Sequence, residues 1–405
     1  MECRDRLSAG HRPLGRAHPL TSGPRPLVPL GEYDWPSLPT DQTLRRAWNN
    51  LVTALRPAQD DAPLVEHGRL DRETGDRLDA LARGPGTAPA EADLAAEMSV
   101  WRDGDSSRLQ VVIVPPCAPR DPVAAWAEAS GLPILPPPPR HLLTDRPGPP
   151  APDLGDSDGP LVIPRLEDWM LRHEDGLDTL RALLAALGTT ERRAVIGCGS
   201  WAWAYLSKAV EIDLALPSPR TFAPHDGERL RDWFADLSQA ERARGTTFRL
   251  ASDGAEVFGE EHNGESHFRR LAATSLGIPW IAWTIWRASL RGLHPTEEDD
   301  AEEAKIDAAR DDVETVWIVD PTPPSQPSGH ERAAHLALHA LLLHGPLDAA
   351  MLDRLLPGTG SGPLVAALVS AGVLLRDGAA LTLAPAAYPD VRRALVNAGF
   401  PQDRL

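Results

Sequence analysis

The chain has almost no lysine: its basic residues are arginines except for Lys208 and Lys305. Almost no position can therefore hold a lysine that acts as a catalytic base or grips a phosphate. Cysteine is also scarce, with only Cys3, Cys117 and Cys198 lying far apart and forming no CxxC pair. The sequence thus argues against a disulfide framework or a four-cysteine zinc site, and it is typical of a reducing cytoplasm.

Long apolar runs are missing too. No stretch approaches the ~20 apolar residues of a membrane-spanning helix, and the first residues lack the pattern of a secretory signal. The net charge of −17 argues against a protein built mainly to coat nucleic acid or an anionic membrane. Apolar residues make up 42% of the 405 residues, which is enough for two to three domains with buried cores. We expect a cytoplasmic protein without an integral membrane segment.

The first hundred residues are mostly polar. Residues 1–40 are rich in Pro, Gly and Arg, which predicts a disordered arm. A helix is expected over 41–55, where leucines and Trp48 recur at helical spacing. It opens a stretch, 41–107, that forms either a helical preamble or a poorly packed linker.

Apolar strands alternate with helical patterns over residues 108–225. The strands are expected at 109–114, 132–135, 161–164, 193–197 and 212–216. Helices are expected at 122–130, 166–187 and 201–208. Because the connections have the length of crossover helices, this order predicts an α/β fold whose parallel sheet is covered by helices on both faces.

The last two regions are expected to be mainly helical. Residues 226–320 read as a helical lid, with helices at 226–243, 267–276 and 279–290 and a short strand at 316–319. Within it, 297–314 is an acidic insertion that holds ten acids against Lys305 and Arg310. Residues 330–405 give three helices, a two-stranded hairpin around Asp377-Gly378 and a final helix. That order predicts a winged-helix domain.

From residue 109 onward this layout resembles the AAA+/STAND group of P-loop ATPases. In that family the first strand leads into GxxxxGK[ST], whose glycine amides and lysine hold phosphate. Here it leads into Pro115-Pro116-Cys117-Ala118-Pro119-Arg120-Asp121, without glycine, lysine or hydroxyl. The resemblance therefore implies a P-loop-like fold that has lost its phosphate loop, so no cofactor is predicted, although ATP binding at an unconventional site stays open.

Two strand ends carry the candidate catalytic and nucleotide-binding residues. After the strand that resembles Walker B, Pro164 stands near the metal-ligand position, and Glu167 and Asp168 follow as candidate catalytic acids or as helix caps. After the strand that resembles the sensor strand, Ser200 is a candidate nucleotide contact or an N-cap. Cys198 there is interpreted as a buried cysteine rather than a nucleophile.

The lid and the tryptophans offer further candidates. Arg287 and Arg291 could match the arginine with which the family's lid contacts nucleotide, although both come late in their helix. The tryptophans form the candidate interaction surface, for which the chain offers Trp201, Trp203, Trp283 and Trp286. Trp201 and Trp203 are two residues apart, so they cannot share one helix face and one of them could meet a partner.

Histidines do not form a recognisable metal motif. His262, Glu265 and His267 lack HExxH spacing, and Gly264 breaks a helix there. His335 and His339 are four residues apart, but no acid or cysteine joins them on that helix, which is interpreted as an ordinary amphipathic helix. We predict no metal site.

The charge of the last region bears on DNA binding. From residue 330 onward six arginines are matched by six acids, so the predicted winged helix lacks a basic footprint. We therefore expect a catalytically degenerate AAA+/STAND-like regulatory or scaffolding protein that binds a protein partner through its tryptophans, its acidic insertion or its N-terminal arm. The alternative is a nucleotide-responsive, DNA-associated regulator; an enzyme of another class using Glu167, Asp168 or Cys198 is a third possibility.

Overall fold

A computed structural model describes most of the chain. The described residues are 23–37, 70–72, 75–82, 84, 86–103, 107–145, 148–155, 159–259, 264–293, 314–320, 331–357 and 361–405. The first 22 residues of the predicted arm, the helix expected over 41–55 and nearly all of the acidic insertion lie outside them. Residues 23–37 of that arm are ordered, with Leu27 and Leu30 buried, which corrects the expectation of disorder there. Among the described residues, none of the helices combines the length and the apolar character that crossing a bilayer requires.

The first sheet has five strands in the order β1-β6-β3-β5-β4. These are β1 (Val28–Pro29), β6 (Arg220–Thr221), β3 (Leu109–Val114), β5 (Ala194–Gly199) and β4 (Leu161–Ile163). The last four run parallel, and β1 pairs antiparallel with β6. The predicted parallel sheet is thus confirmed.

Two predicted strands of this sheet are wrong. Residues 212–216 form a helix, α7 (Ile212–Ala215), and the last parallel strand along the chain is β6, only two residues long. The strand expected at 132–135 is reduced to one parallel bridge between Ile134 and Val162. Both segments are too short for periodicity to identify their pairing.

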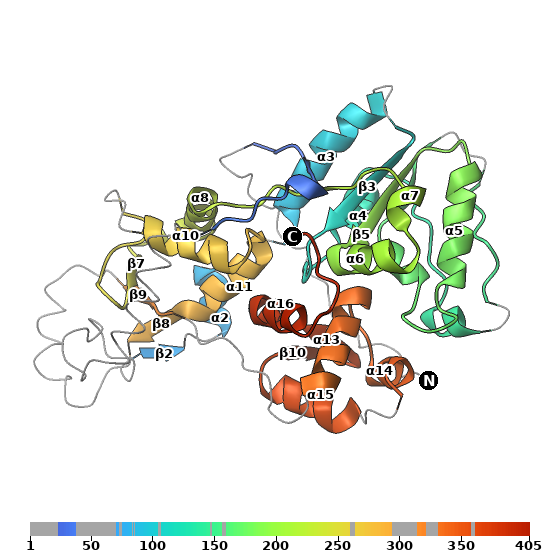
Figure 1. The fold of residues 1–405 in the computed structure, drawn as a ribbon. Helices are drawn as coiled ribbons and strands as arrows, with labels where there is room; N and C mark the ends of the chain where they lie inside the picture. The colour runs from blue at the N-terminus through green and yellow to red at the C-terminus, as the bar shows by residue number, and fades with distance from the viewer. Residues whose placement is uncertain are drawn as a thin grey trace, which may run out of the picture.

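Helices cover both faces of the sheet (Figure 1). One face packs against α3 (Ala88–Asp103) and α4 (Pro122–Ala129), and the other against α5 (Asp178–Thr189) and α6 (Ser200–Ala209). Along β3, Val112 and Val114 belong to the first core and Val111 and Ile113 to the second. Apart from the half-buried Gln110 the strand is apolar, because both of its faces are buried.

Residues 88–103 and 166–189 settle two expectations. The stretch 41–107, expected to be either a helical preamble or a poorly packed linker, contains the 16-residue helix α3. Leu94 and Met98 of this helix are buried against the sheet. The single helix expected at 166–187 is instead a 3₁₀ turn, η4 (Leu166–Trp169), followed by α5. Between them, a Cβ atom on Gly176 would lie 2.3 Å from the Leu171 carbonyl oxygen, so the chain turns there only because glycine has none.

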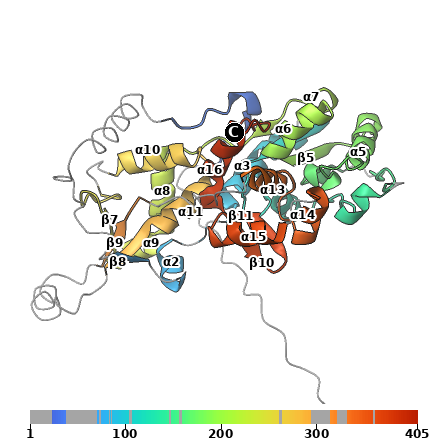
Figure 2. The ribbon, with the colours of Figure 1, turned by 60° about the horizontal axis from the view of Figure 1, so that its bottom comes forward.

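The strand expected at 316–319 in the region 226–320 is present at 315–318, but this region also contains two strands that the sequence did not predict. It contributes three strands to a second sheet in the order β2-β8-β9-β7. These strands are β2 (Leu70–Arg72), β8 (Leu290–Leu293), β9 (Thr315–Ile318) and β7 (Thr247–Leu250). The accompanying helices are α2 (Gly75–Leu81), α8 (Gly227–Leu237), α9 (Gln239–Arg242), α10 (Glu265–Thr274) and α11 (Pro279–Ser289), seen beside the sheet in Figure 2.

Residues 331–405, here called the C-terminal module, contain the predicted order of elements. The helices are α13 (Glu331–His344), α14 (Ala349–Leu355), α15 (Ser361–Ser370) and α16 (Tyr388–Asn397). The hairpin is β10 (Leu374–Asp377) with β11 (Ala380–Leu383), followed by the turn η5 (Pro385–Ala387). The module lies below α6 and α11 in Figure 1, and one continuous apolar core joins it to both.

Candidate functional site

The carboxyl ends of β3 and β5 mark the place where this fold would hold a ligand. The two strands are neighbours, yet β3 leads into α4 on one face of the sheet and β5 into α6 on the other. Open α/β sheets bind ligands in the crevice at such a switch point. The loop 115–121, Glu167 and Ser200, which the sequence analysis singled out, all lie near this edge of the sheet.

The loop after β3 is held by contacts that leave no cradle for phosphate. The indole Nε1 of Trp280 on α11 donates to the Pro116 carbonyl oxygen at 2.7 Å, which ties the loop to that helix. The Asp121 carboxylate accepts from the amides of Val123 and Ala124 at 2.9 and 2.8 Å. The amides at the start of α4 that could bind an anion are therefore already used.

Cys117 lies at the tip of this loop with a left-handed backbone, φ 61°. Burial raises the pKa of its thiol to about 12, so the thiol stays protonated. A non-glycine residue in this conformation marks a tightly determined loop. The segment is ordered, but proline has removed amide donors at 115, 116 and 119.

Glu167 and Asp168 act as structural anchors at the end of β4. The buried Glu167 carboxylate accepts from the Gly199 amide at 3.1 Å and pairs with Arg165 at 3.1 Å. Burial raises the pKa of Glu167. Asp168 accepts from Arg165 at 3.1 Å and from Arg140 at 2.7 Å. Both candidate catalytic acids therefore have cationic or amide partners from their own chain.

These arginines also bind the C-terminal end of α13, and we call this set the arginine contact (Arg140, Arg165 and Asp168 with the His344 carbonyl). Arg140 donates to the carbonyl oxygens of His344 and Pro346, both at 2.6 Å. Arg165 donates to the same His344 oxygen at 3.3 Å. Cations at a helix C-terminus satisfy its free carbonyls and favour its dipole. Sequence spacing gave no sign of this contact.

Two buried histidines lie behind the arginine contact. Nε2 of His344 accepts from the Arg172 amide at 3.2 Å, and the Arg172 side chain lies 2.8 Å from Nδ1 of His339. Burial first, and then the neighbouring arginines, lower the pKa of each histidine to about 3. Both are therefore neutral near neutral pH, and both are buried in the core.

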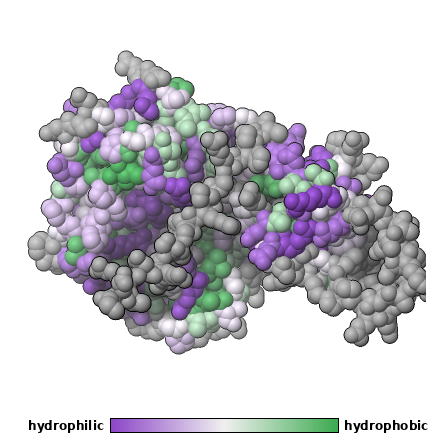
Figure 3. Space-filling model, turned by 180° about the vertical axis from the view of Figure 1, so that it is seen from behind, coloured by the Kyte–Doolittle hydropathy of each residue, from purple (hydrophilic) through white to green (hydrophobic). Residues whose placement is uncertain are grey.

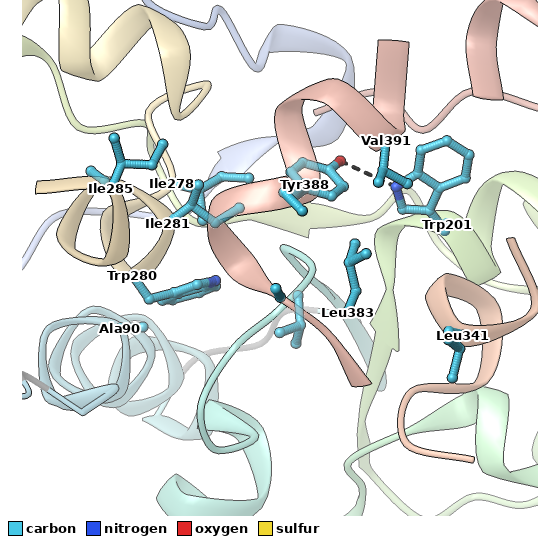
Figure 4. Packing of buried hydrophobic residues seen from close by; sticks show 14 of the residues in the cluster. Ala90, Trp201, Ile278, Trp280, Ile281, Ile285, Leu341, Leu383, Tyr388 and Val391 are labelled. Carbon is cyan, nitrogen blue, oxygen red and sulfur yellow. Dashed lines mark hydrogen bonds between the residues drawn. The ribbon is translucent and has the colours of Figure 1, made fainter. Parts of the chain in front are cut away.

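Ser200 meets a carboxylate from the far end of the chain. Its hydroxyl donates to Asp403 Oδ2 at 2.7 Å, and the Tyr388 hydroxyl donates to the same oxygen at 3.1 Å. Arg392 Nε donates to Asp403 Oδ1 at 3.1 Å. Trp201 Nε1 donates to the Tyr388 hydroxyl at 3.1 Å, the dashed line of Figure 4. We call this set the Asp403 network (Ser200, Trp201, Tyr388, Arg392 and Asp403).

The network overturns the interpretation of Ser200 as an N-cap. The cap position of α6 belongs to Gly199, and Ser200 is the first helical residue with its hydroxyl turned to Asp403. Burial raises the pKa of Asp403, and burial together with Asp403 raises that of Tyr388 far above its usual range. Tyr388 therefore remains a protonated donor to the carboxylate.

The tryptophans do not form an exposed surface. Trp201, Trp203 and Trp286 are exposed by only 1%, 3% and 0%. As their spacing required, Trp201 and Trp203 lie in different cores, Trp203 with α5 and the sheet, and Trp201 against the C-terminal module. Trp283 is half-buried, with the Arg287 guanidinium 5.4 Å from its ring centroid. Trp201 thus packs against the C-terminal module of its own chain rather than lying exposed for another protein.

The lid arginines contact other parts of the molecule. Arg287 donates to the Ala82 carbonyl at 3.1 Å and pairs with Asp79 at 2.6 Å. Arg291 lies in β8 of the second sheet and donates to nearby backbone carbonyls. Cys198 is fully buried, and burial raises its pKa well above the usual value. In the described part of the chain, no three His, Cys, Asp or Glu residues group as metal ligands.

No protein-family model matches this chain, and no curated protein matches it either. Two solved structures align with it along most of their length. The Orc2 protein of Aeropyrum pernix, determined as ADPNP–ADP complexes, is 12% identical over 90% of this chain and 95% of that one, with a TM-score of 0.27. Cdc6p from Pyrobaculum aerophilum is 13% identical over 84% of this chain and 99% of that one, with a TM-score of 0.21. Scores this low do not establish a shared fold, so the function must be argued from the chain's own geometry.

Proposed function

We propose that this chain is a regulatory or scaffolding protein that acts through contacts with other proteins on a degenerate AAA+/STAND-like framework. The observation that carries the proposal is the crevice at the ends of β3 and β5. There, a backbone amide at the start of α4 donates to Asp121, and the hydroxyl of Ser200 donates to the buried carboxylate of Asp403. A phosphate would have to displace these groups.

The chemistry of the crevice argues against phosphoryl transfer. That reaction needs amide donors, a cation on the β- and γ-phosphates and a carboxylate or hydroxyl on magnesium. Here the loop holds prolines in place of glycines, and Glu167 and Asp168 are paired with arginines. The carboxylate of Asp403 beside Ser200 would also repel a phosphate oxygen. These features support a framework that kept its sheet and lost its catalysis.

The alternative, a nucleotide-responsive regulator that binds DNA, has less support. If the C-terminal module is a winged helix, α15 would be its recognition helix, and Ser361–Ser370 contains no charged residue. Its exposed side includes Pro363, Ala366 and Ser370, and the following hairpin offers Arg376 beside Asp377. DNA-binding surfaces are positively charged because they neutralise phosphates. Seen from behind, the lower part of the molecule, where this module lies, carries apolar as well as polar surface (Figure 3).

Titration with a fluorescent ATP analogue, with and without magnesium, tests the proposal. The expected result is no saturable binding, meaning a dissociation constant weaker than about 1 mM. The same titration on Asp403→Ala is the matched arm, because that variant removes the carboxylate from Ser200 without touching the loop after β3. Saturable micromolar binding by the native chain would overturn the proposal. Binding by the variant alone would replace degeneracy with a site that its own carboxylate blocks.

A further inference from the structure

Three side chains that carry nitrogen donors gather where the chain before β1 meets α3 and the start of α8. We call them the cationic cluster (Arg25, His225 and Arg229). The Arg25 amide donates to the buried carboxylate of Asp93 on α3 at 2.7 Å. The Arg25 guanidinium donates to the carbonyl oxygens of residues 223 and 224, just before α8, at 2.6 and 2.8 Å. Arg25 therefore joins two helices that lie far apart in the sequence.

His225 is a neutral hydrogen-bond donor within the cluster. It is exposed by only 4%, and Arg25 Nη2 lies 3.1 Å from its Nδ1. Because a guanidinium can only donate, Nδ1 is the acceptor in this pair, and the neutral ring carries its proton on Nε2. Burial first, and then Arg25 and Arg229, lower the pKa of His225 well below its usual value, so the ring is neutral near pH 7. Its Nε2 therefore presents an N–H group.

The cluster holds buried donors for which the chain supplies no acceptor. These donors are Nε of Arg25, Nε2 of His225, and both Nε and Nη2 of Arg229. All four nitrogens are buried, and none has a hydrogen-bond partner among the described residues. Buried polar groups in folded proteins normally have a partner. Four unpartnered donors on three neighbouring side chains therefore point to an acceptor from outside the chain.

The charges around the cluster favour an anion as that acceptor. Burial, and after it the charge of Arg229, lower the pKa of Arg25, so the two cations lie close enough to repel each other. Asp93 is the buried carboxylate beside them, and its Oδ1 accepts from the Arg25 amide. Asp226 is exposed and caps α8 by accepting from the Arg229 amide at 2.9 Å. Two guanidiniums thus share one buried carboxylate, and a further anion would balance their charge.

We propose that the cationic cluster binds a small tetrahedral oxyanion, a free phosphate or sulfate ion. The donors come from three side chains, which suits an anion whose oxygens point in several directions, whereas one forked guanidinium satisfies a planar carboxylate. Because the donors are buried, we assign a free ion rather than the phosphate of a larger molecule. A bound ion contacts both Arg25 and Arg229 and so strengthens the contact between α3 and α8. The cluster shares no residue with the loop after β3 or with the Asp403 network, so this site is separate from the crevice of the proposed function.

Titration of the full chain with sodium phosphate, sodium sulfate and sodium acetate at constant ionic strength tests this assignment. Thermal unfolding and peptide-resolved hydrogen exchange over 222–237 are followed together. Phosphate and sulfate should bind saturably, with a dissociation constant below about 1 mM. At about ten times the dissociation constant, exchange through opening of the site should slow roughly 10-fold. Acetate at the same concentration should leave the exchange rate unchanged.

Two variants of α8 separate a specific site from a general effect of salt. Arg229→Gln removes a cation whose Nε and Nη2 have no partner among the described residues, so the anion-free protein should keep its native unfolding midpoint. Its dissociation constant for phosphate should rise at least about 10-fold, the factor that one lost hydrogen bond to a charged group corresponds to. Arg231→Gln is the matched control, because it removes the same charge from the same helix, where Arg231 donates to the Gly259 carbonyl at 2.8 Å. This variant should bind phosphate as the native chain does.

Four outcomes would overturn the site. If the native chain gives no saturable response to phosphate, the buried donors are hydrated instead. Equal weakening of phosphate binding in the two variants would mean that the ions act through the overall charge of the protein. A lower unfolding midpoint of anion-free Arg229→Gln, with an unchanged dissociation constant for phosphate, would make Arg229 a structural residue. Protection by acetate equal to that by phosphate would exclude a site selective for tetrahedral oxyanions.

Discussion

Two of the contacts that hold the C-terminal module against the first domain contain an arginine–aspartate pair, and they differ in how far water reaches them. In the arginine contact the side chains of Arg140, Arg165 and Asp168 are exposed by 26%, 31% and 19%. In the Asp403 network the corresponding figures are 10% for Arg392 and 0% for Asp403. Both contacts pair arginine with aspartate, so the difference lies in their surroundings.

The surroundings decide what each contact contributes. A half-exposed ion pair is screened by water and contributes little, whereas a buried pair contributes much only while both partners are present. In the arginine contact two arginines donate to the same carbonyl oxygen of His344, so one hydrogen bond remains when the other is lost. The Asp403 network has a single carboxylate. We therefore expect the module to tolerate damage at the first contact and to depend on the second.

Arg392→Ala is expected to have the largest effect. It leaves Asp403 buried without its cation, which typically costs about 3–5 kcal/mol. The free energy of unfolding of the C-terminal module, measured by denaturant titration or by hydrogen exchange in α16, should fall by that amount. A loss below about 1 kcal/mol would mean that water reaches the carboxylate, and the contrast between the two contacts would disappear.

Acidification is expected to have the second largest effect on the free energy of unfolding of the C-terminal module. Folding lowers the pKa of His339 and His344 to about 3, against about 6.5 in an unfolded chain. Only the unfolded state takes up protons between these values, so stability is complete above about pH 6.5 and falls as the pH drops towards 3. The expected loss for the two histidines is about 2–3 kcal/mol between pH 7 and pH 5.5.

The double variant His339→Gln/His344→Gln isolates this dependence. Glutamine has no charge to gain, so the pH slope of the module's unfolding free energy should flatten over this range even if the variant is less stable throughout. The slope, rather than the absolute stability, is the quantity to compare. An unchanged slope would assign the acid sensitivity to other groups.

Arg140→Ala is expected to lower the free energy of unfolding of the C-terminal module by less, about 1 kcal/mol. The variant loses hydrogen bonds to His344 and Pro346, but Arg165 still donates to the first of these carbonyls and still pairs with Asp168. A double-mutant cycle with Asp168→Ala measures the pair itself, for which a coupling of about 0.2–1 kcal/mol is expected. A coupling above about 3 kcal/mol would place this contact in the same class as the Asp403 network.

The sequence carried enough information for β3, β4 and β5 of the first sheet and for the hairpin, but not for β1 and β6 or for the second sheet. Apart from Gln110, β3, β4 and β5 consist of apolar residues and glycine, and the hairpin forms around the predicted turn Asp377-Gly378. β7 has a usable signal, since Phe248 and Leu250 are buried and alternate with half-buried Thr247 and Arg249. Four residues of alternation between two helices are weaker than the helical patterns around them, which is why the region was predicted as a lid of helices.

The sequence singled out the candidate residues of the site but gave no indication of their contacts. Glu167, Ser200 and the loop after β3 do meet at one edge, because the ends of parallel strands share an edge. What fills that edge comes from Asp403 and Tyr388, and no periodicity or motif connects them to residues about 200 positions away. The prediction that the tryptophans form an interaction surface was wrong for a related reason. A residue that faces away from the core of the sheet can be covered by another domain of the same chain.

Arg393→Ala is the smallest expected effect and the strictest control, because it changes the neighbour of Arg392 on the same helix. Arg393 pairs with Asp390 one turn away at 2.7 Å, and the two side chains are exposed by 70% and 29%. Such a pair contributes at most about 0.5 kcal/mol. Unfolding free energies of the two alanine variants should therefore differ by several kcal/mol at adjacent positions of α16. Equal losses at 392 and 393 would show that both report on the helix rather than on the buried carboxylate, because helix propensity is the only property that the two substitutions change alike.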